Sequence, residues 1–204
     1  ESLGRELVDA SGGSLLRELR LLRNERLGDL PPPEVPEGYR LGPVAPPDEL
    51  ALAAAIYNGA FSGMWNFRVH DEDEIAGWLE SGQTFPEDCL LLAPEGGDLA
   101  GGGGIAVLAV DPARVENGDR TAYLPDIGVT PAHRRKGLGR VLMCAAAGRA
   151  RELKLSAIEL IADDMDPAAK AFYRSLGFEE MGKITVYEWM CAPVSGEGAR
   201  SGGP

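Results

Sequence analysis

The sequence predicts an α+β fold, because short apolar strands gather in the middle of the chain and are followed by helices that alternate with strands. The apolar runs 89–93 and 103–110 are separated by Glu95-Gly96-Gly97-Asp98, a combination typical of hairpins. A further strand, 123–129, follows the turn-rich residues 116–119. Periodicity and helix-start signals indicate the remaining elements, which are helices at 47–61, 71–79, 137–154 and 167–176, and strands at 39–41, 157–162 and 184–190.

The 204 residues suffice for one well-buried domain with a flanking element. Prolines are so dense within residues 30–36 that neither a helix interior nor a central strand can form there. We therefore divide the chain into an N-terminal extension 1–30, a proline-rich linker 31–38, a main domain 39–191, and a Gly- and Ser-rich tail 192–204 that we expect to be disordered. The leucines of the extension fit a helix and a strand equally well.

The formal net charge of −12 argues against several partners. Nucleic acid and anionic membrane surfaces both require a basic face, so we expect neither as a partner. No window approaches the roughly 20 apolar residues of a membrane span, and the start lacks the features of a secretory signal. Three widely spaced cysteines favour reduced thiols, and His70 and His133 have no partner at metal-ligand spacing. We therefore expect a cytoplasmic protein without a metal site.

The most informative segment runs from residue 126 to residue 140, where a strand is followed by a basic turn and a helix. The first turn of such a helix has backbone N–H groups without intrahelical partners, and the helix dipole adds positive charge there. Gly137 and Gly139 leave these groups accessible. The same turn carries four cationic side chains, Arg134, Arg135, Lys136 and Arg140. This combination predicts a site for a pyrophosphate.

Two common nucleotide motifs are missing from this segment. Neither G-x-x-x-x-G-K-S/T nor G-x-G-x-x-G is present, so kinases and Rossmann dehydrogenases are disfavoured. Taken alone, the turn can also be interpreted as a solvated loop with a glycine-permissive helix start.

Two motifs resemble those of the GNAT N-acetyltransferase family. Arg134-x-x-Gly137-x-Gly139 is similar to the family signature Q/R-x-x-G-x-G/A. Downstream, Asp166-Pro-Ala-Ala169-Lys-Ala-Phe172-Tyr173-Arg-Ser-Leu-Gly177-Phe178 resembles N-x-x-A-x-x-hydrophobic-Y-x-x-x-G-F. The resemblance covers roughly residues 39–191. Residues 57–61 and 85–89 look most like the mycothiol-synthase-like branch, whose members carry two such domains in tandem, so residues 1–30 look like the last strand of a preceding domain.

The resemblance implies a GNAT fold, a mixed, mostly antiparallel sheet of about six to seven strands that is splayed between the fourth and fifth strands and flanked by about four helices. It also implies an acetyl-CoA co-substrate and direct transfer of the acetyl group to a primary amine. The pantetheine arm would lie in the splay, and the N–H of Ile127 or a neighbour would stabilise the developing oxyanion. The residues implied for the cofactor are Ile127, Gly128, Val129, Arg134, Arg135, Lys136, Gly137, Leu138, Gly139, Arg140 and Asp166.

Tyr173 is our candidate for the general acid. A phenol stays protonated at pH 7 and can donate to the departing CoA thiolate. The alternative is that Tyr173 only packs beside Phe172.

Asp126 is our candidate for the general base that the attacking ammonium requires. Family members often carry a glutamate on the fourth strand. Simple alternation places Tyr123, Pro125 and Ile127 on one face, with no glutamate among them, and Leu124, Asp126 and Gly128 on the other. Asp126 is the nearest carboxylate, and a bulge would be needed to re-aim it. Its alternative roles are capping and ion pairing, and Glu159 on the next strand is a weaker candidate.

The acceptor is not encoded in any readable motif, so we expect only a small-molecule or peptide amine. Trp65, Phe67 and Trp78 either wall an acceptor cleft or pack in the core. A homodimer could form by strand pairing through the N-terminal extension. The alternative function is a catalytically silent acyl-CoA-binding domain that serves as a sensor or as half of a tandem protein.

Overall fold

The computed structural model of the chain describes residue 8 and residues 10–96 and 102–189. The predicted disordered tail and part of the predicted hairpin turn therefore lie outside the described residues. The strands are β1 Gly13–Asn24, β2 Tyr39–Pro43, β3 Cys89–Pro94, β4 Gly104–Ala109, β5 Thr121–Val129, β6 Ala157–Asp163 and β7 Glu179–Trp189. The α-helices of the described part are α2 Leu50–Phe61, α3 Glu72–Leu79, α4 Pro112–Glu116, α5 Leu138–Glu152 and α6 Pro167–Ser175.

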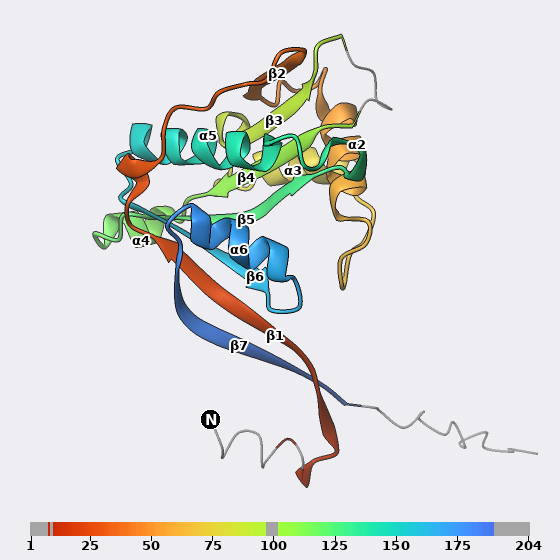
Figure 1. The fold of residues 1–204 in the computed structure, drawn as a ribbon, viewed down its shortest axis with the longest axis vertical. Helices are drawn as coiled ribbons and strands as arrows, with labels where there is room; N and C mark the ends of the chain where they lie inside the picture. Colours follow the sequence, from red (N-terminus) through yellow and green to blue (C-terminus); the bar gives the residue numbers. More distant parts are fainter. Residues whose placement is uncertain (1–7, 9, 97–101, 190–204) are drawn as a thin grey trace, which may run out of the picture.

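All seven strands belong to one sheet, in the order β2-β3-β4-β5-β6-β1-β7 (Figure 1). Neighbouring strands are antiparallel except β5 and β6, which run parallel. This arrangement confirms the predicted α+β fold and its mostly antiparallel sheet.

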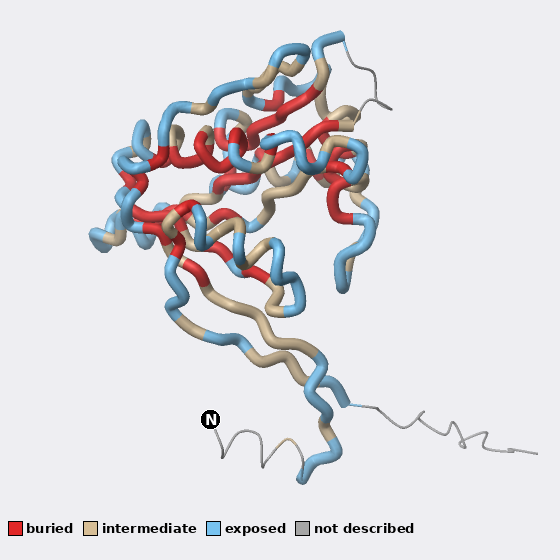
Figure 2. The backbone as a smooth tube through the Cα atoms, viewed as in Figure 1, coloured by how far each residue is buried: buried red, intermediate tan, exposed pale blue. Residues whose placement is uncertain are grey.

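Helices cover the sheet on both faces and enclose two apolar cores. One core packs α5 against the sheet and includes Leu92, Leu108, Leu142 and Leu160. The other packs α2 and α3 against the opposite face around Ile56, Ile75 and Ile105. Both cores follow from strands that are apolar on both faces, as in sheets covered on two sides. Figure 2 shows the most buried backbone in the centre of the sheet and in α5.

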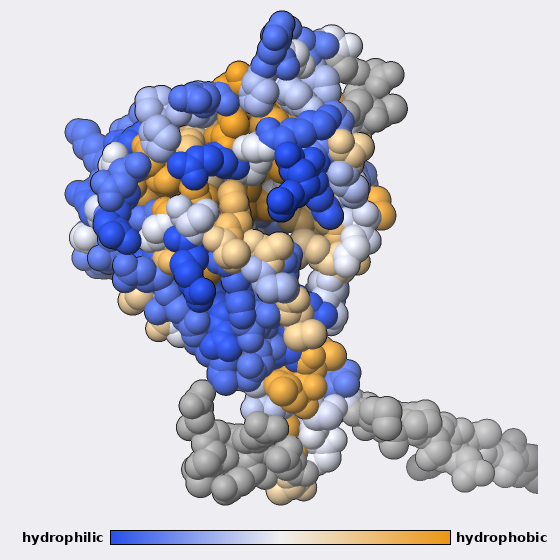
Figure 3. Space-filling model, viewed as in Figure 1, coloured by the Kyte–Doolittle hydropathy of each residue, from blue (hydrophilic) through white to orange (hydrophobic). Residues whose placement is uncertain are grey.

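The N-terminal segment adopts the strand alternative rather than the helix. β1 lies between β6 and β7, with Leu22 opposite Leu160 and Leu19 opposite Ile184. Beyond the contact with β6, β1 and β7 continue as a two-stranded ribbon that projects from the body (Figure 1). Figure 3 shows apolar atoms on this ribbon below a largely hydrophilic face. That the strand derives from a preceding domain stays a prediction.

The predicted splay lies between β5 and β6, which are the fourth and fifth strands of the main domain 39–191. These strands pair only from Thr121 opposite Ala157 to Tyr123 opposite Glu159. Beyond that point β5 remains paired with β4 as far as Val129, and β6 with β1 as far as Asp163. One backbone edge of each strand therefore faces the splay without a strand partner.

A bulge in β5 changes the side-chain alternation that we predicted. Val107 of β4 pairs with Asp126 and Ala109 with Tyr123, so β5 uses one more residue than β4 over this stretch. Leu124 packs in the α5 core, whereas Asp126 hydrogen-bonds to α2 on the opposite face. The prediction that Leu124 and Asp126 share a face was therefore wrong, because the extra residue beside Pro125 reverses the alternation.

Among the described residues, no helix has the length and hydropathy needed to cross a bilayer.

Candidate active site

The basic turn folds into a cradle of backbone N–H groups at the start of α5. Gly137 is the N-cap residue, with φ of 81° and no side-chain cap, and Arg135 also has a positive φ of 63°. Such alternating conformations point successive N–H groups to one side. Within the described residues, the N–H groups of residues 135–139 donate to no acceptor. The predicted anion site is therefore geometrically open.

The four cations of the turn have different environments. Arg134 donates through Nε to the carbonyl of Val129 at 2.9 Å and through Nη2 to that of Ala60 at 3.3 Å. Its guanidinium therefore ties the end of β5 to the end of α2. Arg135 and Arg140 are exposed and make no ion pair in the described part of the chain. Their charge remains available to a ligand, so they are stronger phosphate candidates than Arg134.

The start of α5 is fixed by packing on both sides. Leu138 is buried in the core beneath it. A Cβ on Gly139 would lie 3.5 Å from Cζ of Phe172, so α6 packs closely on this turn. Asp166 caps α6, where its Oδ1 accepts from the N–H groups of Ala168 and Ala169 at 2.9 Å each. The structure thus shows Asp166 as a helix cap, and its contact with the cofactor stays a prediction.

Ile127, Gly128 and Val129 form the free edge of β5 along the splay. They pair with β4 on one side and have no strand partner on the other. This edge leads from the bulge to the turn that carries the cradle. An extended chain with amide groups could hydrogen-bond along it as an added strand does.

Gly128 allows α2 to approach this edge. A Cβ at position 128 would lie 2.7 Å from Cζ of Phe61 and 3.1 Å from Cβ of Ala60. Gly128→Ala is expected to lower the free energy of unfolding by about 1–3 kcal/mol, the usual cost of overpacking, in urea denaturation. Gly42→Ala is the matched control, because nothing lies within 4 Å of a Cβ at that strand glycine. An equal loss in both variants would contradict the packing explanation.

Asp126 is partly buried on the α2 face of the sheet. Tyr57 of α2 donates its hydroxyl to Oδ1 of Asp126 at 3.2 Å. Burial raises the pKa of the Asp126 carboxyl, and the Tyr57 hydrogen bond and the charge of His70 oppose this only in part. Burial and the neighbouring Asp126 also raise the pKa of Tyr57 well above its ordinary range. A carboxylate of raised pKa is a better proton acceptor than an exposed one.

Sequence reasoning missed the aromatic surroundings of Asp126. Tyr57 contacts His70 and Trp78 edge-on, with ring centroids 5.1 and 5.0 Å apart. Asn58 holds the backbone of His70 by accepting from its N–H at 2.9 Å and donating to its carbonyl at 2.7 Å. Neither contact has a local signal, because the partners come from α2, α3 and the loop between them.

Tyr173 lies on α6 at the other side of the sheet. Its ring packs against Phe172 and Phe178, with centroids 5.3 and 5.7 Å away. Burial raises the pKa of its hydroxyl to about 12, with a smaller contribution from the charge of Asp166. Within the described residues the hydroxyl has no hydrogen-bond partner. Tyr173 is therefore a protonated donor available to a ligand.

Other predicted side chains are engaged elsewhere. Glu159 pairs with Arg23 at 2.7 Å and lies 3.8 Å from Arg114, which satisfies its charge. Trp65 lies beneath the guanidinium of Arg17, 5.4 Å from its ring centroid, and Trp78 packs against the α2 and α3 core. In the described part of the chain no group of three or more His, Cys, Asp or Glu side chains could hold a metal ion. Cys89 and Cys144 are buried free thiols.

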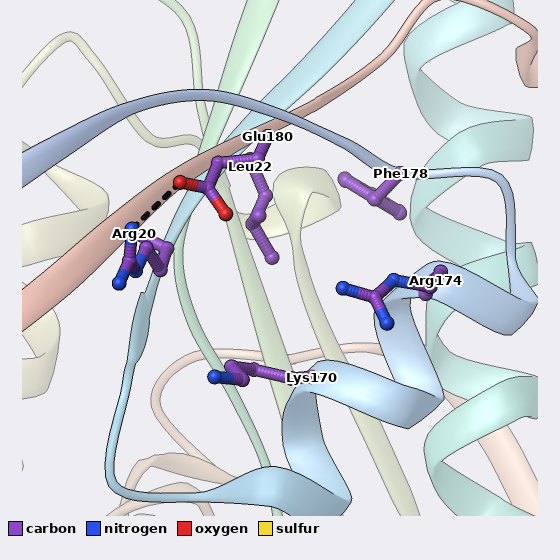
Figure 4. A pocket seen from close by; sticks show the side chains of 6 residues that line it. All are labelled: Arg20, Leu22, Lys170, Arg174, Phe178 and Glu180. Atoms are coloured by element: carbon purple, nitrogen blue, oxygen red, sulfur yellow. Dashed lines mark hydrogen bonds and ion pairs between the residues drawn. The ribbon is translucent and has the colours of Figure 1, made fainter.

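A shallow pocket of about 140 Å³ lies between β1, α6 and β7 (Figure 4). Its lining residues are Arg20, Leu22, Lys170, Arg174, Phe178 and Glu180. Arg20 donates to Glu180 at 2.7 Å and to Asp164 at 3.0 Å, and Lys170 donates to Asp164 at 2.6 Å. These charges largely neutralise one another. The side chains around the pocket therefore form an ion-pair network that holds α6 to β1.

Residues 50–178 match the acetyltransferase (GNAT) family. The chain belongs to that family. This finding confirms the predicted family.

Individual relatives agree with this assignment. The chain is 29% identical over 183 residues to the mycothiol acetyltransferase of Streptomyces coelicolor, covering 87% of this chain and 55% of that protein. It is 28% identical over 133 residues to the L-methionine sulfoximine/L-methionine sulfone acetyltransferase of Salmonella typhimurium, covering 64% of this chain and 74% of that protein.

The solved structures agree on the fold. The GCN5-related N-acetyltransferase of Sphaerobacter thermophilus superposes with a TM-score of 0.71 at 20% identity, over 92% of this chain and 56% of that one. The predicted resemblance to mycothiol acetyltransferases is confirmed by the sequence comparison. The chain spans little more than half the length of the mycothiol relative.

Proposed function

We propose that the chain transfers an acetyl group from acetyl-CoA directly to a primary amine of a small molecule or peptide. The observation that carries the proposal is the continuity of the free edge of β5 with the open cradle at the start of α5. The edge offers backbone groups to an amide-bearing arm, and the cradle offers N–H groups and cations to a pyrophosphate. The residues present therefore fit acetyl-CoA.

Each part of the site has a separate role in binding. The backbone of residues 127–129 holds the pantetheine arm, while the N–H groups of residues 135–139 hold the phosphates. Arg135, Lys136 and Arg140 add charge that the acidic surface elsewhere does not supply. The fixed packing of Leu138 and Gly139 keeps the cradle in place before the ligand binds.

When bound, acetyl-CoA supplies an activated acetyl group as a thioester. Asp126 accepts the proton that the ammonium loses, directly or through water, which frees the nitrogen lone pair to form the C–N bond. The N–H of Ile127 or a neighbour stabilises the developing oxyanion. Tyr173 donates a hydrogen bond to the sulfur as the C–S bond breaks, and the nitrogen gives up its second proton to the departing thiolate or to water as the amide forms. Because its pKa is raised to about 12, hydrogen bonding to the thiolate is its main contribution.

The relatives support an amine acceptor without identifying it. One is named for mycothiol and another for L-methionine sulfoximine and L-methionine sulfone, which favours a small molecule. The Asp126 carboxylate, on the α2 face of the sheet, would attract a cationic amine. Pairing of two copies through the projecting β1 and β7 ribbon and a cytoplasmic location stay predictions.

The test is release of free CoA from acetyl-CoA in the presence of a panel of primary amines. Amine-dependent release is expected for the wild-type chain and is expected to fall strongly in Asp126→Asn. Tyr187→Phe, on β7, is a matched control that should release CoA at the wild-type rate. Saturable acetyl-CoA binding with no release for any amine would support the silent sensor instead.

A further inference from the structure

Tyr39, the first residue of β2, reaches the phosphate-binding turn from a distant part of the chain. Its hydroxyl lies 2.7 Å from Nδ1 of His133, and Nζ of Lys136 donates to the same oxygen at 3.3 Å. The Tyr39 and His133 rings meet edge-on with centroids 5.7 Å apart, and the Lys136 ammonium lies 6.0 Å from the Tyr39 ring centroid. One hydroxyl thus joins two residues of the turn.

The Tyr39 hydroxyl is the middle member of two hydrogen bonds. An ammonium can only donate, so the Tyr39 oxygen accepts from Lys136. The Tyr39 hydroxyl forms its second hydrogen bond with Nδ1 of His133, and either group donates in it according to the tautomer of the ring. The three side chains form a chain of donors and acceptors that runs from Lys136 through Tyr39 to His133.

The His133 ring is fixed from behind. A Cβ on Gly102 would lie 3.2 Å from Cδ2 of His133 and 2.7 Å from Oγ1 of Thr130, so the backbone at Gly102, just before β4, packs directly on this ring. Thr130 in turn hydrogen-bonds Gly103 through both its hydroxyl and its backbone. The hydrogen-bond partner of Tyr39 therefore has a defined position, and so does the Tyr39 hydroxyl.

The hydrogen bond to Tyr39 lowers the entropy cost of binding an anion through Lys136, because a free lysine side chain loses rotamer freedom when it binds. Tyr39 restrains the ammonium through its hydrogen bond and ring, so part of that ordering precedes binding. Arg135 and Arg140 have no comparable contact within the described residues. Arg134 is restrained by hydrogen bonds to two backbone carbonyls, which occupy N–H donors that a phosphate would otherwise use.

We propose that Tyr39 is a positioning residue of the cofactor site, which orients Lys136 toward the phosphates of CoA through its hydrogen bond to His133. The inference rests on the proposed function, since it assumes that the cradle binds CoA. It adds a residue from outside the turn, and outside the segment that matches the family, to the determinants of cofactor affinity.

The test is a double-mutant cycle of Tyr39→Phe and Lys136→Met, read by calorimetric titration with CoA. Tyr39→Phe keeps the ring and is expected to weaken binding about threefold to tenfold, the size typical of a lost preorganising hydrogen bond. In the Lys136→Met background the same change is expected to have no effect. In turnover, Tyr39→Phe should raise KM for acetyl-CoA and leave kcat unchanged. Tyr187→Phe serves as the control.

A second arm uses dephospho-CoA, which lacks the 3′-phosphate. Loss of the Tyr39 effect with this ligand would assign Lys136 to the 3′-phosphate, and its persistence would assign Lys136 to the pyrophosphate. Unchanged CoA affinity in Tyr39→Phe, or an equal weakening in the presence and absence of Lys136, would overturn the inference. Failure of the folded wild-type chain to bind CoA would instead overturn the proposed function.

Discussion

Asp126→Asn is expected to lower kcat roughly 10²- to 10⁴-fold, the range typical for loss of a general base. The amide keeps the shape of the side chain and can still accept the hydrogen bond from Tyr57, but it cannot take a proton from the amine. Initial rates of CoA release with a reactive amine provide the measurement. Acetyl-CoA affinity should remain close to wild type, because Asp126 lies on the opposite face from the cradle.

The same variant carries a second expectation, for stability. Because burial raises the Asp126 pKa above that of the unfolded chain, the folded protein binds the proton more tightly. Ionisation therefore costs stability as the pH rises from the unfolded value near 4 through the raised folded pKa. Asp126→Asn should be at least as stable as wild type at pH 7 in urea denaturation. A variant that is both active and destabilised would contradict the assigned role.

The pH profile of the wild-type enzyme gives an independent reading of the base. Activity should fall on the acid side as the pH drops through the raised pKa of Asp126, because only the carboxylate accepts a proton. Tyr57→Phe removes a hydrogen bond that favours the carboxylate, so the acid limb should move to higher pH. An unchanged acid limb would show that the titration of Asp126 does not control activity.

Tyr173→Phe is expected to lower kcat by roughly a hundredfold, as for a lost transition-state hydrogen-bond donor. The loss should appear in kcat with little change in acetyl-CoA affinity, because the hydroxyl acts on the departing sulfur. Single-turnover rates and calorimetric titration measure the two quantities separately. Equal turnover in wild type and variant would leave Tyr173 as a packing residue beside Phe172 and Phe178.

Local sequence signals were sufficient for most of the fold. The hairpin of β3 and β4, the helices α5 and α6 and the strands β5 and β6 follow from apolar runs, turn residues and two motifs, whereas the parallel pairing of β5 with β6 comes from the structure. The helix α4 was missed, although Asp111 caps it and Pro112 begins it, because the glycine and asparagine that follow suggested only a turn. The place of β1 could not be predicted, because its leucines fit both helix and strand periodicity. Only the pairing with β6 and β7 makes this segment a strand.

The candidate site was predictable only where its determinants are local. The glycines of the turn indicated the cradle, since backbone conformation there depends on the residues themselves. The bulge at Pro125, the diversion of Arg134 to the carbonyls of Val129 and Ala60, and the contact of Tyr57 with Asp126 depend on tertiary packing. Alternation alone therefore placed Asp126 on the wrong side of the strand relative to Leu124.

The measurement that tests the central claim most directly is calorimetric titration of acetyl-CoA into the wild-type chain and into an Arg135→Glu, Arg140→Glu variant. Saturable binding by the wild type, weakened roughly a hundredfold or more in the variant and weakened at high salt, is the expected result. The two arginines are exposed and form no ion pair with the residues that the structure describes, so the variant should retain its unfolding midpoint. No binding by folded wild-type protein, or equal affinity in the charge-reversed variant, would contradict the assignment of the cradle to the cofactor phosphates.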